Sequence, residues 1–364
     1  MHFAFSDQQT EFRQAVRQVL AKECTTDHLR GAFERPAART PRWDTLAGMG
    51  VVGLSVPESL GGLGLGLVDL VPLLEEAGRV ALPEPLLETT ALLAPLLVEL
   101  GGPARSHAWL EGIAAGRVAG AVGSVAARRP APIAGADGAD LLVLATGGTG
   151  PGDDTEVHVV EASTVTVRSV SSLDPTRRLG IPHWAPTAET RVLAGAEARA
   201  ALRRNEACAA VATAAELLGL TERMITMAAE YAKERRQFGQ PIGSFQAVKH
   251  LLAGAQVRLE FARPVVYAAA WSLDGAEPAW WRAASSAKAS ASDAATEAAR
   301  VSLQVHGAIG YTWECDLHLF LKRAWALAEA WGSAADHRAR VLESLLDQAP
   351  ADEALLEKAR LDEA

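Results

Sequence analysis

Apolar residues near the start of the chain recur at the three-and-four spacing that lines one face of a helix. Phe12, Val16, Val19 and Leu20 form such a stripe, and similar patterns continue to about residue 116. From residue 197 onward the same periodicity returns in longer runs. The chain is therefore predicted to begin and end in helical regions.

The C-terminal region is predicted to contain four packed helices. A third long helix is expected to open at Pro278, a residue favoured in a first helical turn, and to run to about Val305. A final helix is expected over 323–342, so an antiparallel bundle is favoured. The first two helices each have an apolar face at helical spacing: Val211, Ala214, Leu218 and Ile225, then Val248, Leu251, Ala255, Leu259, Ala262 and Val266.

Between these helical regions the chain is rich in Gly and Pro and contains short runs with β-branched alternation. Residues 141–144, 157–160 and 165–170 are predicted strands, and the turn-rich GGTGPGDD at 147–154 fits a hairpin connection. The pattern predicts a mainly α protein with a small β domain. Its expected segments are an N-terminal helical domain, a middle β domain, a C-terminal helical bundle and an acidic tail, over 1–117, 118–196, 197–348 and 349–364.

A glycine-rich turn, GGLGLG at 61–66, lies inside the first segment and precedes another apolar helix. A phosphate-binding loop of similar composition must follow a strand and open a helix. Residues 43–54 have a pattern of helix and loop instead. The turn is therefore expected to connect two helices and not to form a Rossmann dinucleotide site.

Charge and cysteine usage exclude several classes of function. The formal net charge of −9 argues against a nucleic-acid surface, since phosphate binding needs clustered Lys and Arg. The N-terminus lacks the features of a secretory signal, and the longest apolar stretch, 90–100, is too short to span a bilayer. Cys24, Cys208 and Cys315 lie far apart, which suits a reduced cytoplasm. No histidine has a partner at metal-ligand spacing, so no metal is expected.

Two C-terminal stretches carry the strongest functional signal. The first, YAKERRQFGQPIGSFQAVKHLLA at 231–253, contains a break between two predicted helices, with Arg235 and Phe238 beside turn-forming glycines and a proline. A guanidinium can pair with phosphate and a Phe ring can pack on a planar ring, so a nucleotide ligand is chemically reasonable, with an ordinary loop as the alternative. The second, QVHGAIGYTWE at 304–314, follows the third long helix.

Together these stretches resemble the acyl-CoA dehydrogenase superfamily. The N-terminal FSDQQTEFRQAVRQVL and VPESLGGLGLGLVDLVPLLEEAGR are also similar to that family, as is SLDPTRRLG in the middle region. The resemblance therefore covers nearly the whole chain. It implies the fold of that family, with a helical domain, a β domain and a four-helix bundle in this order.

The resemblance also implies FAD held across a subunit interface. Arg235 would contact its pyrophosphate, Phe238 would pack on its adenosine side, and Gln246 would hydrogen-bond the cofactor. Gln304 and Gly307 would approach it from the other subunit, where a glycine allows close backbone approach. Without the family, Gln304 would equally fit a surface or capping amide.

Members of the family remove the α proton of an acyl-CoA thioester with a glutamate while the β hydride passes to flavin, so a carboxylate base is expected. In most members this Glu follows an Arg that corresponds to Arg323, and Gly332 stands there in this chain. A minority of members place it early in the first long C-terminal helix, where this chain has Ala209. Neither position offers a carboxylate.

Three other glutamates are candidates for the base. Glu206 lies one helical turn before Ala209 on roughly the same face, and Glu216 lies about two turns after it. Glu329 is close to Gly332 in the sequence. Each equally fits an ordinary solvated or capping glutamate, so the sequence leaves the catalytic residue unassigned.

Some bacterial relatives, known from steroid side-chain degradation, are heterotetramers in which one subunit supplies the Glu and its sister lacks it. This chain resembles the sister. We therefore expect an acyl-CoA substrate, a homologous subunit in a hetero- or homotetramer, and an electron-transfer flavoprotein as electron acceptor. The middle segment VAGAVGSVAARRP (118–130) and Ala308 depart from the family pattern, which puts this chain's own flavin contacts in question. The alternatives are a scaffold protein that has lost flavin, and a flavin oxidase or hydroxylase relative.

Overall fold

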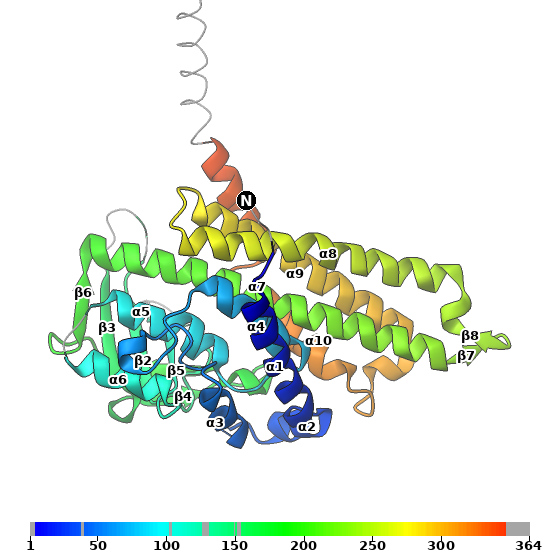
Figure 1. Cartoon of the computed structure of the whole chain (residues 1–364), viewed down its shortest axis with the longest axis horizontal. Helices are drawn as coiled ribbons and strands as arrows, with labels where there is room; N and C mark the ends of the chain where they lie inside the picture. The colour runs from blue at the N-terminus through cyan, green and yellow to red at the C-terminus, as the bar shows by residue number, and fades with distance from the viewer. Residues whose placement is uncertain are drawn as a thin grey trace, which may run out of the picture.

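The structure is a computed structural model that describes residues 4–37, 40–101, 104–125, 131–148, 150 and 154–346. The molecule is elongated, with the main sheet at one end and a bundle of long helices extending to the other (Figure 1). The expected acidic tail over 349–364 lies outside the described residues, as does part of the 118–130 segment.

The N-terminal region is helical, as the periodicity predicts. Ser6 begins the first helix through a capping box, in which its hydroxyl accepts from the Gln9 amide and Gln9 accepts from Ser6. Val16 and Leu20 of the predicted stripe are buried. The elements are α1 (Asp7–Glu23), α2 (Thr26–Glu34), α3 (Pro41–Gly48), η1 (Glu58–Leu60), α4 (Leu67–Arg79), the π-helical η2 (Leu87–Leu93), α5 (Ala94–Glu99) and α6 (Ala104–Ala114).

The GGLGLG turn connects helical segments, as expected. It follows the short helix η1, and its last residue, Gly66, is the N-cap of α4. The backbone amides of Leu67 and Val68 donate to the carboxylate of Asp274 at 3.0 and 2.8 Å. The amides that start this helix are therefore used inside the chain, and no dinucleotide phosphate is needed to satisfy them.

The middle region forms small sheets. The main sheet has the order β1-β2-β3-β6, with β1 and β2 parallel and the other pairs antiparallel, while β4 and β5 pair separately. The three predicted strands are present as β2, β3 and β4. The bounds are β1 (Gly120–Ser124), β2 (Leu141–Thr146), β3 (Glu156–Glu161), β4 (Thr166–Ser169), β5 (Gly180–His183) and β6 (Arg191–Ala194).

The C-terminal region is a bundle built on α7 (Gly195–Glu234), α8 (Gln246–Asp274), α9 (Trp280–His306) and α10 (Leu317–Glu329). A small hairpin, β7 (Arg236–Gln237) and β8 (Gln240–Pro241), joins α7 to α8 at the far end of the bundle (Figure 1). The short helix η6 (Gly307–Tyr311) follows α9.

Two predicted helix boundaries in this region are wrong. The third long helix begins at Trp280, because Pro278 lies in the preceding turn. The predicted final helix is two helices: α10 ends at Glu329 and another covers 334–346. The break falls at Trp331 and Gly332, whose φ angles of 59° and 106° are incompatible with a right-handed helix.

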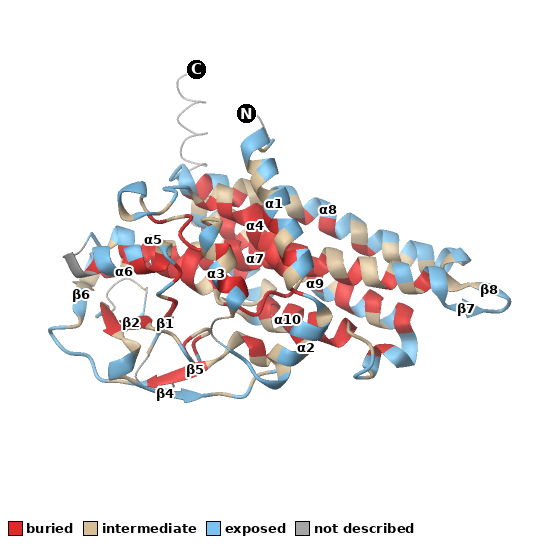
Figure 2. Ribbon diagram, turned by 60° about the horizontal axis from the view of Figure 1, so that its bottom comes forward, coloured by how far each residue is buried: buried red, intermediate tan, exposed pale blue. Residues whose placement is uncertain are grey.

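Helices α4 and α7 cross at very close range in the middle of the molecule. A Cβ on Gly78 would collide with the backbone of Glu216, and one on Gly219 would collide with the backbone of Glu75. These two glycines therefore set the helix separation. The most buried residues gather around this crossing (Figure 2), so the core of the protein is centred on α7.

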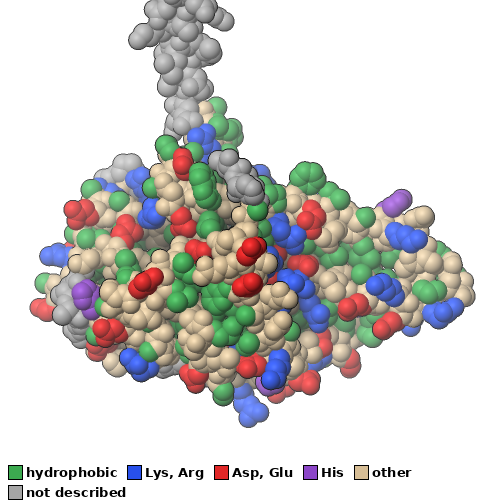
Figure 3. Space-filling model, viewed as in Figure 1, with side chains coloured by type: hydrophobic (Ala, Val, Ile, Leu, Met, Phe, Trp, Pro, Cys, Tyr) green, Lys and Arg blue, Asp and Glu red, His purple; other side chains and the backbone are tan. Residues whose placement is uncertain are grey.

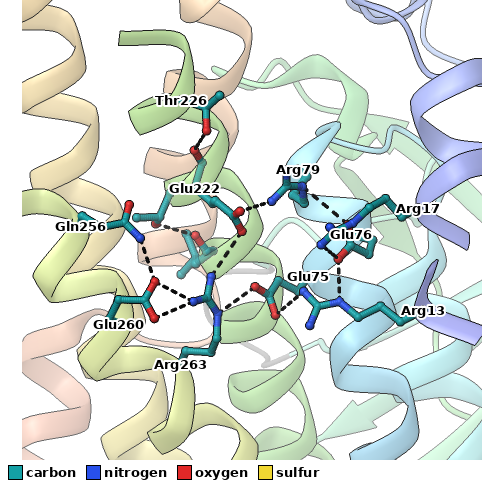
Figure 4. Close-up of polar contacts among 12 residues, drawn as sticks. Arg13, Arg17, Glu75, Glu76, Arg79, Glu222, Thr226, Gln256, Glu260 and Arg263 are labelled. Carbon is teal, nitrogen blue, oxygen red and sulfur yellow. Dashed lines mark hydrogen bonds and ion pairs between the residues drawn. The ribbon is translucent and has the colours of Figure 1, made fainter. Parts of the chain in front are cut away.

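An ionic network ties α1 to the bundle beside this crossing (Figure 4). Glu75 and Glu76 on α4 are almost completely buried. Glu75 pairs with Arg13 of α1 at 3.1 Å and with Arg263 of α8 at 3.1 Å. Glu76 pairs with Arg13 at 2.7 Å and with Arg17 at 2.6 Å. Buried carboxylates require such partners, so the network fixes α1 against the core.

Acidic and basic side chains are intermingled over the face shown in Figure 3, without a single-sign patch. Within the described part of the chain, no helix has both the length and the apolar character needed to cross a bilayer.

Candidate functional site

The first C-terminal motif lies at the far end of the bundle. Arg235 ends α7, and the hairpin that follows turns at Phe238 and Gly239, both with positive φ. Phe238 is 92% exposed, and its ring meets only the edge of Phe245, with centroids 6.1 Å apart. Gln246, the first residue of α8, is also exposed. The predicted cofactor residues of this motif therefore face outward.

The second motif reaches the same end of the bundle. Tyr231 near the end of α7 stacks on His306 at the end of α9, with ring centroids 4.6 Å apart. Burial lowers the pKa of His306, and its Nδ1 lies 2.8 Å from the Ser302 carbonyl oxygen, so this residue is a helix-packing histidine. Gln304 and Gly307 are exposed beside it. The structure thus brings the two motifs to one end.

This exposed end has the chemistry that one side of a dinucleotide site requires. Arg235 offers a guanidinium for phosphate and Phe238 a free aromatic face for a planar ring. At Gly307, with φ of 64°, an added Cβ would meet nothing within 4 Å, so the backbone is open to close approach. FAD fits these residues, provided that a second surface covers them.

The two positions where a catalytic Glu is expected differ in setting. Ala209 on α7 is fully buried. Gly332 lies in the break after α10, where its carbonyl oxygen accepts from Lys288 Nζ at 3.0 Å. Lys288 also donates to the Ala328 carbonyl at 2.8 Å, which places a cation at the C-terminal end of α10. Burial lowers the pKa of Lys288 to about 8. Lys288 therefore holds the turn that contains Gly332.

A groove of about 360 Å³ lies beside both positions. Glu206 and Ala210 line it from α7, on either side of Ala209 in the sequence, and His337 lines it next to Gly332. Arg203 and Arg340 supply positive charge, and Trp280, Trp281, Ala207, Ala284 and Ser285 complete the wall.

His337 is a fixed, neutral member of this wall. Its Nε2 lies 3.1 Å from the Trp331 carbonyl, which can only accept, so Nε2 carries the proton. Its Nδ1 then accepts from the Ser285 hydroxyl at 3.2 Å. Burial lowers the pKa of His337 to about 4, so the imidazole is uncharged at neutral pH.

The structure separates the three candidate glutamates. Glu206 lines the groove with part of its surface exposed; partial loss of water at the groove wall raises its pKa, while Arg340 and Arg203 lower it. Glu329 is exposed at the end of α10. Glu216 lies away from the groove, in a small cavity where the β region meets the helices. Of the three, Glu206 is the one that lines the groove beside Ala209 and Gly332.

Charged residues from four parts of the chain lie at or beside the cavity that holds Glu216. Arg323 on α10 donates through Nε to Asp174, through Nη1 to the Leu82 carbonyl at 3.0 Å, and through Nη2 to Thr176. We call this region, formed by Glu88, Asp174, Arg177, Glu216 and Arg323, the junction cluster.

Sequence reasoning did not find Lys288, His337, Glu88 or Arg177. A lysine and a histidine on helices carry no spacing signal, and Glu88 and Arg177 come together only in three dimensions. One stretch of the sequence pointed to this region. Asp174, Thr176 and Arg177 lie within SLDPTRRLG, which is similar to the middle region of the family, but the sequence does not show which residues they contact.

No group of three or more His, Cys, Asp or Glu side chains suited to a metal ion occurs among the residues that the structure covers. The cysteines are unpaired, and burial raises the pKa of the Cys24 thiol to about 11 and of Cys208 to about 12. These thiols are therefore unreactive packing groups at neutral pH.

Comparisons with known proteins agree with the fold and with the two motifs. Residues 6–117 match the family described as acyl-CoA dehydrogenase, N-terminal domain, and residues 207–346 match acyl-CoA dehydrogenase, C-terminal domain. The chain is 34% identical over 326 residues to acyl-CoA dehydrogenase IpdE2 of Mycobacterium tuberculosis, covering 88% of this chain and 92% of that protein. It is 32% identical to IpdE2 of Mycolicibacterium smegmatis, covering 90% and 95%.

Solved structures show the same relationship. The ChsE4-ChsE5 complex from Mycobacterium tuberculosis superposes with a TM-score of 0.82 at 25% identity, over 95% of this chain and 99% of that one. The butyryl-CoA dehydrogenase of Megasphaera elsdenii shares the fold, with a TM-score of 0.81 at 20% identity over 95% and 100%. The chain belongs to the acyl-CoA dehydrogenase family.

Proposed function

We propose that this chain is one subunit of a heteromeric, FAD-dependent acyl-CoA dehydrogenase whose partner supplies the catalytic Glu. The observation that carries the proposal is a mismatch between two regions. The bundle end exposes all five residues expected to contact the cofactor, while the two expected base positions hold Gly332 and Ala209. The chain thus offers cofactor contacts outward and lacks a base at either position.

In this arrangement, FAD bound at the interface supplies the hydride acceptor. Arg235 pairs with its pyrophosphate, Phe238 covers the adenosine side, and Gln246 donates or accepts a hydrogen bond. Gln304 and Gly307 border the same surface, where the glycine backbone can approach closely. A homologous subunit covers the exposed Phe238 ring and excludes water from it.

The groove beside Gly332 supports an acyl-CoA substrate. Arg203 and Arg340 place positive charge at a groove of about 360 Å³, which suits the phosphates of CoA, and Trp280 and Trp281 offer apolar surface. Electrons leaving the flavin are proposed to pass to an electron-transfer flavoprotein. The ChsE4-ChsE5 complex, with two differently named chains, supports the mixed assembly.

A second version of this function has Glu206 as the proton acceptor in this chain alone. Its support is that Glu206 lines the groove and that its pKa is shifted upward, the direction that favours a general base. The two versions differ in whether a partner subunit must supply the catalytic base.

The deciding experiment is to purify the chain alone and together with a homologue that carries the Glu, and to record mass, flavin spectrum and acyl-CoA-dependent bleaching. The heteromer predicts flavin and bleaching only in the mixed complex. Bleaching by the lone chain, abolished by Glu206→Gln and retained by Glu329→Gln, would establish the second version. A mixed complex without flavin would overturn both.

A further inference from the structure

The junction cluster holds an unbalanced set of charges around a cavity of about 30 Å³. Glu216 and Arg323 are buried, and Glu88 and Arg177 are partly buried. Three of the guanidinium groups at or beside this cavity have an acidic partner: Arg323 pairs with Asp174, Arg42 with Glu84 at 2.7 Å, and Arg178 with Asp137 at 3.6 Å. Within each pair the two charges cancel. The charges of Arg177, Glu88 and Glu216 remain to be balanced.

Arg177 alone cannot neutralise two carboxylates. Its Nη1 donates to the Ala326 carbonyl at 3.4 Å, and its buried Nε has no hydrogen-bond partner among the residues described. With Glu88 and Glu216 both ionised, the three groups carry a net charge of −1 in a water-poor site. One added proton makes them neutral, and a buried site of this kind strongly favours neutrality.

We propose that Glu88 and Glu216 hold one proton between them, and that this proton controls how firmly the β region docks on the helices. Glu216 comes from α7, Glu88 from η2 and Arg323 from α10, while Asp174 and Arg177 flank and form the short helix η4 (Pro175–Arg177) of the β region. The cavity, which both carboxyl groups line, is large enough to hold a water molecule.

The electrostatic environment supports this assignment. Burial raises the pKa of Glu88 and raises that of Glu216 to about 7, while Arg323 and Arg177 act in the opposite direction on Glu216. Because the two carboxyls interact, they titrate as a pair, and the proton that they share leaves near neutral pH. Its loss adds one buried negative charge at the contact between η4 and α7.

The first test is infrared difference spectroscopy of the full chain titrated from pH 5 to pH 9. We expect a protonated carboxylic-acid band that disappears through neutral pH and that is lost or strongly shifted in both Glu216→Gln and Glu88→Gln. Glu329→Gln, which changes an exposed glutamate on α10, should leave the band unchanged. Absence of the band in the unsubstituted protein at pH 6, or its persistence in both junction variants, would overturn the proposal.

The second test measures docking of the β region by amide hydrogen exchange in segment 174–180. Protection there should fall several-fold more between pH 6 and pH 8 in the unsubstituted protein than in Glu216→Gln, after correction for intrinsic exchange. Equal pH dependence in the two proteins would contradict the docking role even if the proton is present. Neither measurement needs flavin or a partner subunit, so the outcome is independent of the proposed enzymatic function.

Discussion

The exposed end of the bundle and the junction cluster use the same residue types in opposite settings. Arg235 and Phe238 stand in solvent, and nothing in the described chain covers the Phe238 ring. Arg323 and Glu216 are buried, and Arg323 pairs with Asp174 inside the fold. A buried charge must be balanced inside the fold, whereas an exposed one is available to a ligand. The exposed end of the bundle is therefore available to bind a second molecule, whereas the junction cluster contributes to the folding of this chain.

The largest effect is expected from breaking the junction itself. Arg323→Met removes the partner of Asp174 and leaves that carboxylate buried, which should cost about 3–5 kcal/mol of unfolding free energy. Urea denaturation measures it. Arg168→Met, at an exposed arginine of β4, should change stability by less than about 0.5 kcal/mol. Similar losses in both variants would show that Arg323 has no special role.

A charge-neutral substitution at the same cluster should make stability less dependent on pH. The pKa of Glu216 rises from 4.5 to about 7 on folding, so the folded state holds its proton more tightly. The tighter binding of this proton therefore stabilises the folded state fully below about pH 4.5, and this stabilisation is lost as the pH rises to 7. As the pH rises from 4.5 to 8, the free energy of unfolding of Glu216→Gln should increase by about 2–3 kcal/mol relative to that of the unsubstituted protein.

Thermal or urea unfolding at a series of pH values provides this measurement. Glu329→Gln is the matched control, and its stability profile should follow that of the unsubstituted protein. A Glu216→Gln profile parallel to the unsubstituted one would mean that the carboxyl ionises normally in the fold.

At the exposed end, substitution should affect the cofactor and leave the fold intact. Phe238→Ala removes an aromatic face worth about 1–3 kcal/mol in ring stacking, so flavin should dissociate from the mixed complex roughly 10- to 100-fold more readily. Flavin fluorescence on dilution reports this change. Leu173→Ala, at another exposed apolar residue, should leave flavin affinity unchanged. Loss of stability without loss of flavin would assign Phe238 to folding.

The smallest effect is expected from restoring a carboxylate at the missing base position. Gly332 has a φ of 106°, and an added Cβ would lie 3.1 Å from His337 Nε2. Gly332→Glu should therefore cost about 1–2 kcal/mol through backbone strain and crowding. It should give no dehydrogenase activity in the lone chain, as measured by acyl-CoA-dependent bleaching. Activity in that variant would show that the turn already has catalytic geometry.

Local patterns in the sequence were sufficient for the main helices and for three of the strands, β2, β3 and β4. The three-and-four stripe at Val16 and Leu20 is buried as predicted, and residues 141–144 lie within β2. The two wrong boundaries fall where a single residue changes the backbone. The break at Gly332 was missed because the apolar pattern continues across it, and only the positive φ angles reveal the turn.

The candidate site could be predicted only in part. The two motifs near Arg235 and Gln304 are contiguous stretches, so their residue types were visible, and their meeting at one end of the bundle depends on the Tyr231–His306 stack. Helical spacing placed Glu206 one turn before Ala209 and Glu216 about two turns after it. It could not show that one faces a groove and the other a closed cavity, because that depends on what packs against each turn.

The sequence by itself determined the family, the order of helical and β regions, and the absence of a Glu at both expected base positions. These properties reside in periodicity and contiguous motifs, which need no long-range contact to be seen. Only the tertiary structure decided which charges are buried and which are exposed. Burial depends on the close crossing of α4 and α7 at Gly78 and Gly219, which brings residues from distant parts of the chain around one carboxyl group.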